Sequence, residues 1–169
     1  MPDFIIAVLV RNRFGVLNRV TSMFRRRRFN IKCLTVSETE SPEYSRITVT
    51  FEGDGGAHEK QQLIDQLYKL EDVCFIKELA NKAAVTSELL LIKVKNDPET
   101  RALVRDTADA FGAVTMDYTR ESVIMQMTGS SRRVSAFIDL MRDYTILEIC
   151  RTGVVSLERG SETIRKTEL

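Results

Sequence analysis

The sequence predicts an α+β fold that consists of two consecutive βαββαβ units. Short apolar or alternating runs, typical of strands, are separated by segments in which apolar residues recur at helical spacing. The order strand, helix, strand, strand, helix, strand occurs in residues 4–79 and again in residues 88–157. Each half is therefore expected to form a ferredoxin-like, four-stranded antiparallel sheet with two helices on one face.

The first half begins with a continuous apolar run at Phe4–Val10, which is typical of a strand buried on both faces. The stripe that follows predicts a helix and comprises Val16, Leu17, Val20, Met23 and Phe24. Residues 31–37 and 45–52 alternate and predict two strands, joined by a turn that contains Glu38, Glu40 and Glu43. The second helical stripe, at Leu63, Ile64, Leu67 and Leu70, precedes a fourth strand at residues 73–79.

The second half begins with a strand at residues 88–95. Asp97 and Pro98 indicate the start of a helix and Gly112 its end, with an inward face of Leu103, Val104, Thr107 and Phe111. Two strands follow, at residues 113–118 and 122–128. Ser130 or Ser131 is expected to cap a helix with inward Val134, Phe137, Ile138 and Met141. The last strand lies within residues 144–157, extended or interrupted at Gly153.

The predicted domains are residues 1–80 and 88–160, with a linker at 81–87 and a polar, frayed tail at 161–169. Helices would leave one face of each sheet uncovered, although the first strand is apolar on both sides. An apolar uncovered face invites a partner. Either the two halves cover each other, or the chain forms a side-by-side homodimer that extends the sheet. We expect a homodimer with the two sheets side by side.

Composition indicates a cytoplasmic protein without membrane attachment. No apolar run approaches the ~20 residues that span a bilayer, and the first ten residues lack the features of a signal peptide. Cys33, Cys74 and Cys150 are odd in number and far apart, so we expect buried thiols rather than a disulfide framework or a metal site.

Catalytic chemistry finds no support in the sequence. His58 is the one histidine, in a glycine-rich loop, and is interpreted as a solvated residue. The acids at positions 38, 40 and 43 are interpreted as a hairpin tip, and Gly53–Gly56 lacks the Lys-Ser/Thr sequel of a phosphate-binding loop. We therefore expect no catalytic residues and no metal site in this chain.

The informative constellation is the turn Asn12–Gly15 between the first strand and the first helix. It exposes helix amides that lack internal partners and favour a carboxylate. Gly15 permits close approach of a ligand, and Asn12 can bond its polar groups. Alternatively, Asn12 caps the turn locally and Gly15 only makes it tight.

A longer pattern carries a family resemblance. It runs Asn12-x-x-Gly15-Val16-Leu17-x-Arg19-Val20, then Met23-Phe24, Arg27, Phe29-Asn30-Ile31, Leu34 and Val36. It continues in Ser45–Thr48, Gln66–Leu70, Glu88–Val94, Phe111–Val114, Asp117, Ile146–Glu148, Arg151–Gly153 and Glu158–Gly160. Over residues 3–160 the chain resembles the small regulatory subunit of acetohydroxyacid synthase, or acetolactate synthase, whose first half is an ACT domain.

The resemblance implies a non-catalytic regulatory subunit that forms a homodimer. A branched-chain amino acid, valine above all, would bind where two ACT domains meet. One wall would come from Asn12, Phe14, Gly15, Val16 and Leu17, and the other from Asn30 and Ile31 of the neighbouring chain. The subunit would stimulate a large catalytic subunit that carries thiamine diphosphate, FAD and magnesium, and valine would impose feedback inhibition.

Two departures from the family pattern affect the site. Arg28 stands where the family has a glycine that would cap the first helix, and an arginine in that left-handed conformation costs ~1 kcal/mol. Arg11 and Arg13 flank Asn12 where the family often has acids, which favours a carboxylate and disfavours an ammonium group. The identity of the effector therefore stays open.

Two other classes of function remain as alternatives. Residues 1–35 hold eight basic residues and one acid, which could serve an anionic partner. Ferredoxin-like sheets can bind RNA, but the strands lack an aromatic RNP pattern, so we expect no nucleic acid. The other alternative is a stand-alone ACT-type amino-acid sensor that acts on a different enzyme.

Overall fold

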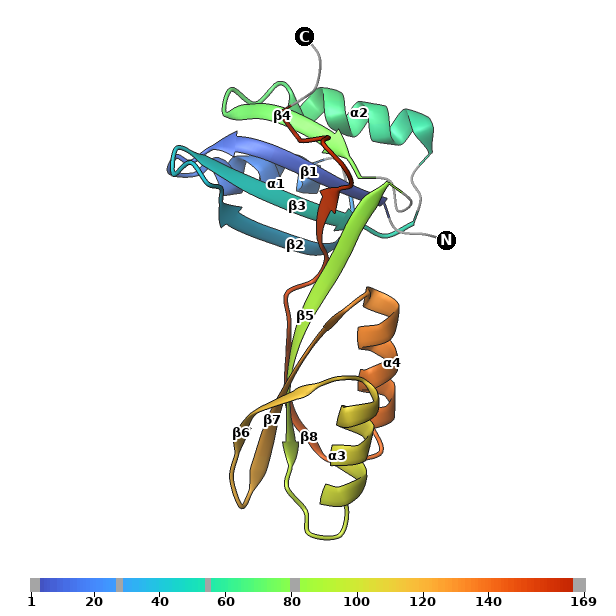
Figure 1. Ribbon diagram of the computed structural model, residues 1–169. Helices are drawn as coiled ribbons and strands as arrows, with labels where there is room; N and C mark the ends of the chain where they lie inside the picture. The colour runs from blue at the N-terminus through green and yellow to red at the C-terminus, as the bar shows by residue number, and fades with distance from the viewer. Residues whose placement is uncertain (1–3, 27–28, 54–55, 80–82, 166–169) are drawn as a thin grey trace. The chain divides into compact units, whose positions relative to one another are not determined.

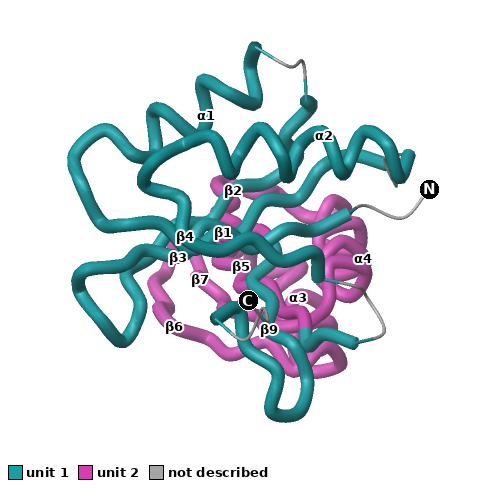
Figure 2. The backbone as a smooth tube through the Cα atoms, turned by 90° about the horizontal axis from the view of Figure 1, so that it is seen from above, with its two compact units in different colours: residues 1–85, 154–169 teal, residues 86–153 magenta. Residues whose placement is uncertain are grey.

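The computed structural model describes residues 4–26, 29–53, 56–79 and 83–165, which form two βαββαβ units (Figure 1). One compact unit comprises residues 1–85 and 154–169, and the other comprises residues 86–153 (Figure 2). The predicted fold class is therefore confirmed.

The first unit contains a sheet with the strand order β2-β3-β1-β4. Its strands are β1 (Phe4–Arg11), β2 (Ile31–Glu38), β3 (Tyr44–Phe51) and β4 (Val73–Glu78), and its helices are α1 (Val16–Arg26) and α2 (Ala57–Leu67). All strand pairs are antiparallel, with Phe4 opposite Phe51 and Arg11 opposite Tyr44. Alternate residues of β1 face the two helices and are buried with Val20, Phe24, Leu63 and Leu67.

The second unit contains a sheet with the strand order β6-β7-β5-β8. Its elements are β5 (Ala84–Lys95), α3 (Arg101–Ala110), β6 (Val114–Tyr118), β7 (Ser122–Gly129), α4 (Ser131–Met141) and β8 (Ile146–Arg151). Both helices lie on the same face of the sheet (Figure 1). The expected inward face of α4 is buried, and the Ser130 side chain caps this helix by accepting a hydrogen bond from the Arg133 amide.

The chain then returns to the first unit, through β9 (Val155–Glu158). Gly153, at φ +75°, interrupts the last strand, and β9 pairs with β5. Val154 and Ile164 pack against Ile5 and Ala7, on the face of the first sheet that carries no helix. This packing explains why β1 is apolar on both sides. Val154 belongs to the half predicted as residues 88–160, and Ile164 belongs to the predicted tail, so this cover comes from the C-terminal end of the chain.

Several local expectations require correction. None of the three cysteines is fully buried: Cys33 and Cys74 are half-buried, and Cys150 is exposed. Leu103 faces solvent, and α3 begins at Arg101 rather than directly after Asp97, which instead caps a preceding turn by accepting a hydrogen bond from the Glu99 amide.

The predicted linker and tail also differ in local structure from the expectation. Residues 80–82 lie outside the described part of the chain, whereas residues 84–87 begin strand β5. In the tail, the Arg165 guanidinium contacts Glu40 at 3.1 Å and lies over the ring of Tyr44. Arg28 lies outside the described residues, so the prediction about its effect on the helix end stays a prediction.

Candidate functional site

The Asn12–Gly15 loop connects β1 to α1 and is held against the turn between β2 and β3. The Asn12 side-chain amide donates hydrogen bonds to Glu38 Oε1 and to the Pro42 carbonyl oxygen, both at 3.0 Å. The Asn12 backbone N–H donates to the Glu43 carbonyl oxygen at 2.7 Å. One of the acids interpreted as a solvated hairpin tip therefore fixes the asparagine, and the asparagine does not cap α1.

Gly15 adopts a backbone conformation that favours glycine, with φ +78°. Its carbonyl oxygen accepts from the Arg19 amide at 3.0 Å, so α1 begins directly after the turn. The first amides of a helix have no carbonyl partner within it and carry partial positive charge. The start of α1 therefore has donors of the kind that suit a carboxylate, and the binding of an effector there stays a prediction.

Apolar side chains accompany these donors at the surface of the first unit. Phe14 is fully exposed and Leu17 is 42% exposed, although the sequence had placed Leu17 on the inward stripe of the helix. Val16, in contrast, is buried in the core of the unit. The Val16 amide donates to the Arg13 carbonyl oxygen at 3.3 Å, which leaves the Leu17 and Asn18 amides at the start of the helix. The loop and the first turn of α1 therefore combine these two amides with two apolar side chains that a further molecule could cover.

A buried carboxylate lies beside the loop and was missed by the sequence analysis. The Asp72 side chain is 10% exposed, binds the Arg19 guanidinium, and lies 3.8 Å from Arg13 Nη1. The Asp72 carbonyl oxygen also accepts from the Arg11 amide at 2.8 Å. This acid offsets part of the positive charge predicted from Arg11 and Arg13. No spacing in the sequence connects Asp72 with a loop about 60 residues earlier.

The other two expected site residues, Asn30 and Ile31, lie at the opposite end of the sheet. Ile31 pairs with Phe51 on β3, whereas Arg11, next to Asn12, pairs with Tyr44. Seven residues of β3 separate these positions, about 23 Å along an extended strand. The Asn30 amide donates to Glu52 Oε2 at 2.7 Å. One chain therefore does not unite the two predicted walls of the site.

Other candidate groups offer little chemistry. His58 lies in the first turn of α2 and contacts Gln62 at 2.9 Å, rather than standing in a loop. Within the described ranges, no three His, Cys, Asp or Glu side chains are grouped so that they could hold a metal ion. Across the same ranges, no helix is both long and apolar enough to cross a membrane.

Comparison with known proteins covers both units of the chain. Residues 87–160 match the family model described as the small subunit of acetolactate synthase, and residues 6–75 match that of the small-subunit-like ACT domain. The chain belongs to the acetolactate synthase small-subunit family. Its members are regulatory rather than catalytic subunits.

Similarity to individual small subunits extends over nearly the whole chain. The chain is 46% identical to a probable acetolactate synthase small subunit of Archaeoglobus fulgidus, covering 93% of this chain and 97% of that protein. It is 40% identical to the small subunit of Bacillus subtilis, covering 94% and 91% respectively. The crystal structure of the acetolactate synthase small subunit of Thermotoga maritima shares 33% identity and a TM-score of 0.88, with 96% and 100% coverage.

Proposed function

We propose that this small subunit binds the large catalytic subunit of acetolactate synthase in the cytoplasm, raises its activity and imposes feedback inhibition by a branched-chain amino acid, valine above all. Membership of the family supports the choice of partner. The partner would carry thiamine diphosphate, FAD and magnesium and perform the reaction. The small subunit would contribute only the effector site and the contacts that transmit its occupancy.

The observation that carries the proposal is the geometry of the β1–α1 loop. The positive φ of Gly15 presents the start of α1 at the surface, where its amides can receive the effector carboxylate. The exposed side chains of Phe14 and Leu17 lie within the same loop and first turn, and can contact an aliphatic side chain. An amino acid with a branched apolar side chain matches both features.

A homodimer would complete this site. Asn12 and Asn30 lie at opposite ends of β3 within one chain, so only a second copy could place Asn30 and Ile31 beside the loop. Asn12 holds the Glu38 side chain near the loop, and Asn30 holds the Glu52 side chain near the start of β2. Those carboxylates could accept the effector ammonium, while the loop amides receive its carboxylate.

Feedback inhibition requires coupling between this site and the catalytic subunit. The effector must bind the inhibited complex more tightly than the active complex, typically by ~1–3 kcal/mol. A site between two chains can provide this difference, because the bound effector changes the stability of one arrangement of the two sheets relative to another.

Calorimetric titration of the purified chain with L-valine, with D-valine as the control, tests the site. We expect stereospecific binding that Gly15→Asp abolishes, because the new side chain is strained at positive φ and repels a carboxylate. Asn30→Ala is expected to weaken binding. When each variant is mixed with the large subunit, its loss of valine inhibition should follow its loss of valine binding. Equal inhibition with the wild-type chain, Gly15→Asp and Asn30→Ala would contradict the proposal.

A further inference from the structure

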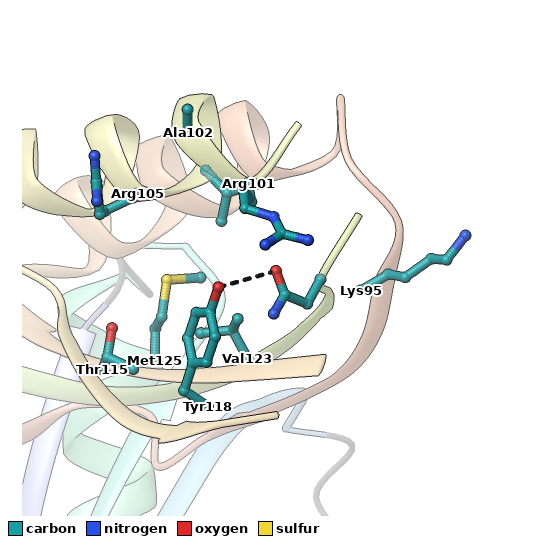
Figure 3. Close-up of a pocket in the computed structure, with 10 residues that line it drawn as sticks. Lys95, Arg101, Ala102, Arg105, Thr115, Tyr118, Val123 and Met125 are labelled. Carbon is teal, nitrogen blue, oxygen red and sulfur yellow. Dashed lines mark hydrogen bonds between the residues drawn. The ribbon is translucent and has the colours of Figure 1, made fainter. Parts of the chain in front are cut away.

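The second unit contains a cavity of about 390 Å³ that the proposed function does not use (Figure 3). It lies beside α3 and the adjoining strands, and its size is within the range of small-ligand sites. The side chains that shape it are Asn96, Arg101, Arg105, Thr115, Tyr118 and Met125.

The course of β6 explains why the cavity exists. Thr115 and Tyr118 pair with Met125 and Val123, two buried residues of the core against which the helices pack. On an ordinary sheet, residues on this face would also be covered by a helix. Every residue of β6 is nevertheless exposed, with Tyr118 at 60%. An apolar floor and an uncovered aromatic ring therefore meet beside α3.

The charge of the cavity is positive. Arg101 and Arg105 are exposed and lie one turn apart on α3. Both line the cavity on the side opposite Tyr118 and Thr115; the Arg101 guanidinium extends toward Tyr118, and that of Arg105 stands at the edge beside α3 (Figure 3). Because like charges four residues apart destabilise a helix slightly, the repulsion between these two arginines is unfavourable for α3 unless an anion lies between them. Lys95 extends away from the cavity and pairs with Asp97 at 3.5 Å. Within the described part of the lining there is no aspartate or glutamate, and Arg105 has no ion-pair partner among the described residues.

Polar groups are held in place at one end of the cavity. Asn96 is only 5% exposed, and its side-chain amide donates to the Thr119 carbonyl oxygen at 2.6 Å. Its Oδ1 accepts from the Tyr118 hydroxyl at 3.4 Å, a long bond that a better acceptor could replace. Tyr118 is therefore oriented by a fixed asparagine while its hydroxyl remains available to a ligand.

From these features we infer that the second unit holds a binding site for a small organic anion with an apolar body and no ammonium group. Two guanidinium groups and a tyrosine hydroxyl suit a carboxylate or phosphate head group. Val104, Val123 and Met125 suit an apolar body. A lining without acids provides no partner for an ammonium group, which distinguishes this site from the amino-acid site proposed for the first unit.

The test compares 4-methylpentanoate with L-leucine, which is the same molecule carrying an additional ammonium group, and with phenyl phosphate. Each probe is titrated into the full ¹⁵N-labelled chain while amide shifts of residues 95–105 and 115–125 are followed. We expect the carboxylate or the phosphate to shift these amides and leucine to leave them unchanged. The tighter of the two anions identifies the head group.

Variants assign the binding to the cavity. Arg101→Gln combined with Arg105→Gln should weaken the anion at least about tenfold, because charge-assisted hydrogen bonds are lost. Arg132→Gln, an exposed arginine on α4, is the matched control and should have no effect. Gly15→Asp should also leave anion binding intact, which separates this inference from the valine site. Absence of shifts with both anions, or equal binding to the double variant, would overturn it.

Discussion

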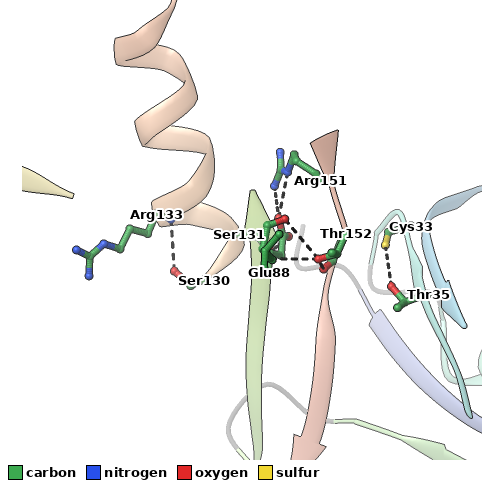
Figure 4. A network of polar contacts seen from close by, with 10 residues as sticks. Cys33, Thr35, Glu88, Ser130, Ser131, Arg133, Arg151 and Thr152 are labelled. Carbon is green, nitrogen blue, oxygen red and sulfur yellow. Dashed lines mark hydrogen bonds and ion pairs between the residues drawn. The ribbon is translucent and has the colours of Figure 1, made fainter. Parts of the chain in front are cut away.

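At the scale of single residues, buried carboxylates determine how distant segments are held together. Glu88, the first residue of a predicted strand, has a side chain that is 5% exposed. It accepts hydrogen bonds from Arg151 Nε at 3.1 Å, from Arg151 Nη2 and from the Ser131 hydroxyl (Figure 4). The neighbouring Thr152 hydroxyl accepts from the Leu89 amide at 3.1 Å. Arg151 and Thr152, which belong to the segment Arg151–Gly153 of the family pattern, thus anchor β8 to β5.

Replacement of Glu88 should therefore destabilise the second unit. Glu88→Gln leaves the Arg151 guanidinium without its carboxylate, and we expect a loss of about 1–3 kcal/mol in the free energy of unfolding. Urea unfolding followed by circular dichroism measures this loss. Glu148→Gln, an exposed acid on β8, is the control and should change stability by less than about 0.5 kcal/mol. Equal losses in both variants would show that the buried pair does not stabilise the unit.

The sequence indicated few of these residue-scale contacts. Asn12 and Gly15 were singled out because their position between a strand and a helix has local consequences. Asp72 and Glu88 were not, because their partners lie 53 and 63 residues away, and a single sequence carries no signal for such pairs. Burial of the cysteines was misjudged because apolar neighbours in a strand do not reveal which face a residue occupies.

At the scale of elements, the C-terminal segment is the least expected feature. The Arg46 guanidinium donates to the Ser156 carbonyl oxygen at 2.8 Å, and Lys77 Nζ lies 2.6 Å from Glu158 Oε2. Burial lowers the pKa of Arg46, whereas the hydrogen bond to Glu158 raises the pKa of Lys77. Polar contacts from β3 and β4 therefore hold β9 against the rest of the first unit, together with the apolar contacts of Val154 and Ile164.

Glu158→Gln should loosen this segment in a pH-dependent manner. Because the pKa of Lys77 is raised in the folded chain, its contribution to stability is present below the ordinary lysine pKa and is lost as pH rises through the raised value. We expect a lower melting temperature than that of wild type at pH 7, and a smaller difference once the pH rises above the ordinary lysine pKa and through the raised value. Glu162→Gln, whose carboxylate is 56% exposed and 3.5 Å from Lys77, should change little. A pH-independent difference would contradict this role of the ion pair.

Patterns of hydrophobicity predicted the elements well where one face is buried, as in α4 and β3. These patterns were less informative for α3. Leu103 fits the helical stripe but is exposed, whereas Ala108, which was not assigned to the inward face, is buried in the core. Apolar periodicity identifies a helix, but small residues such as alanine pack closely without contributing strongly to the pattern. The return of residues 154–165 to the first unit depends on contacts with β3 and β4, which no local pattern records.

At the scale of the whole molecule, two units of the same topology carry different surfaces. The first unit presents helix amides, Phe14 and Leu17 in the β1–α1 loop and the first turn of α1. Asn30, predicted to form the other wall of the site, lies at the far end of β3. The second presents a cavity with two arginines and no acid among the described lining residues. The tandem fold followed from the sequence because the order of elements repeats. The proposed function requires that a second chain complete the amino-acid site.

A mixture of two defective chains is the first experiment for this requirement. Gly15→Asp damages the loop wall and Asn30→Ala damages the other wall, so a heterodimer of the two would contain one undamaged site. After exchange of subunits at equal concentrations, calorimetry with L-valine should detect about a quarter of the wild-type number of sites at wild-type affinity, as expected for random pairing in a twofold dimer. Neither variant alone should show them. If the mixture shows only the sum of the two separate variants, the site does not form between two chains.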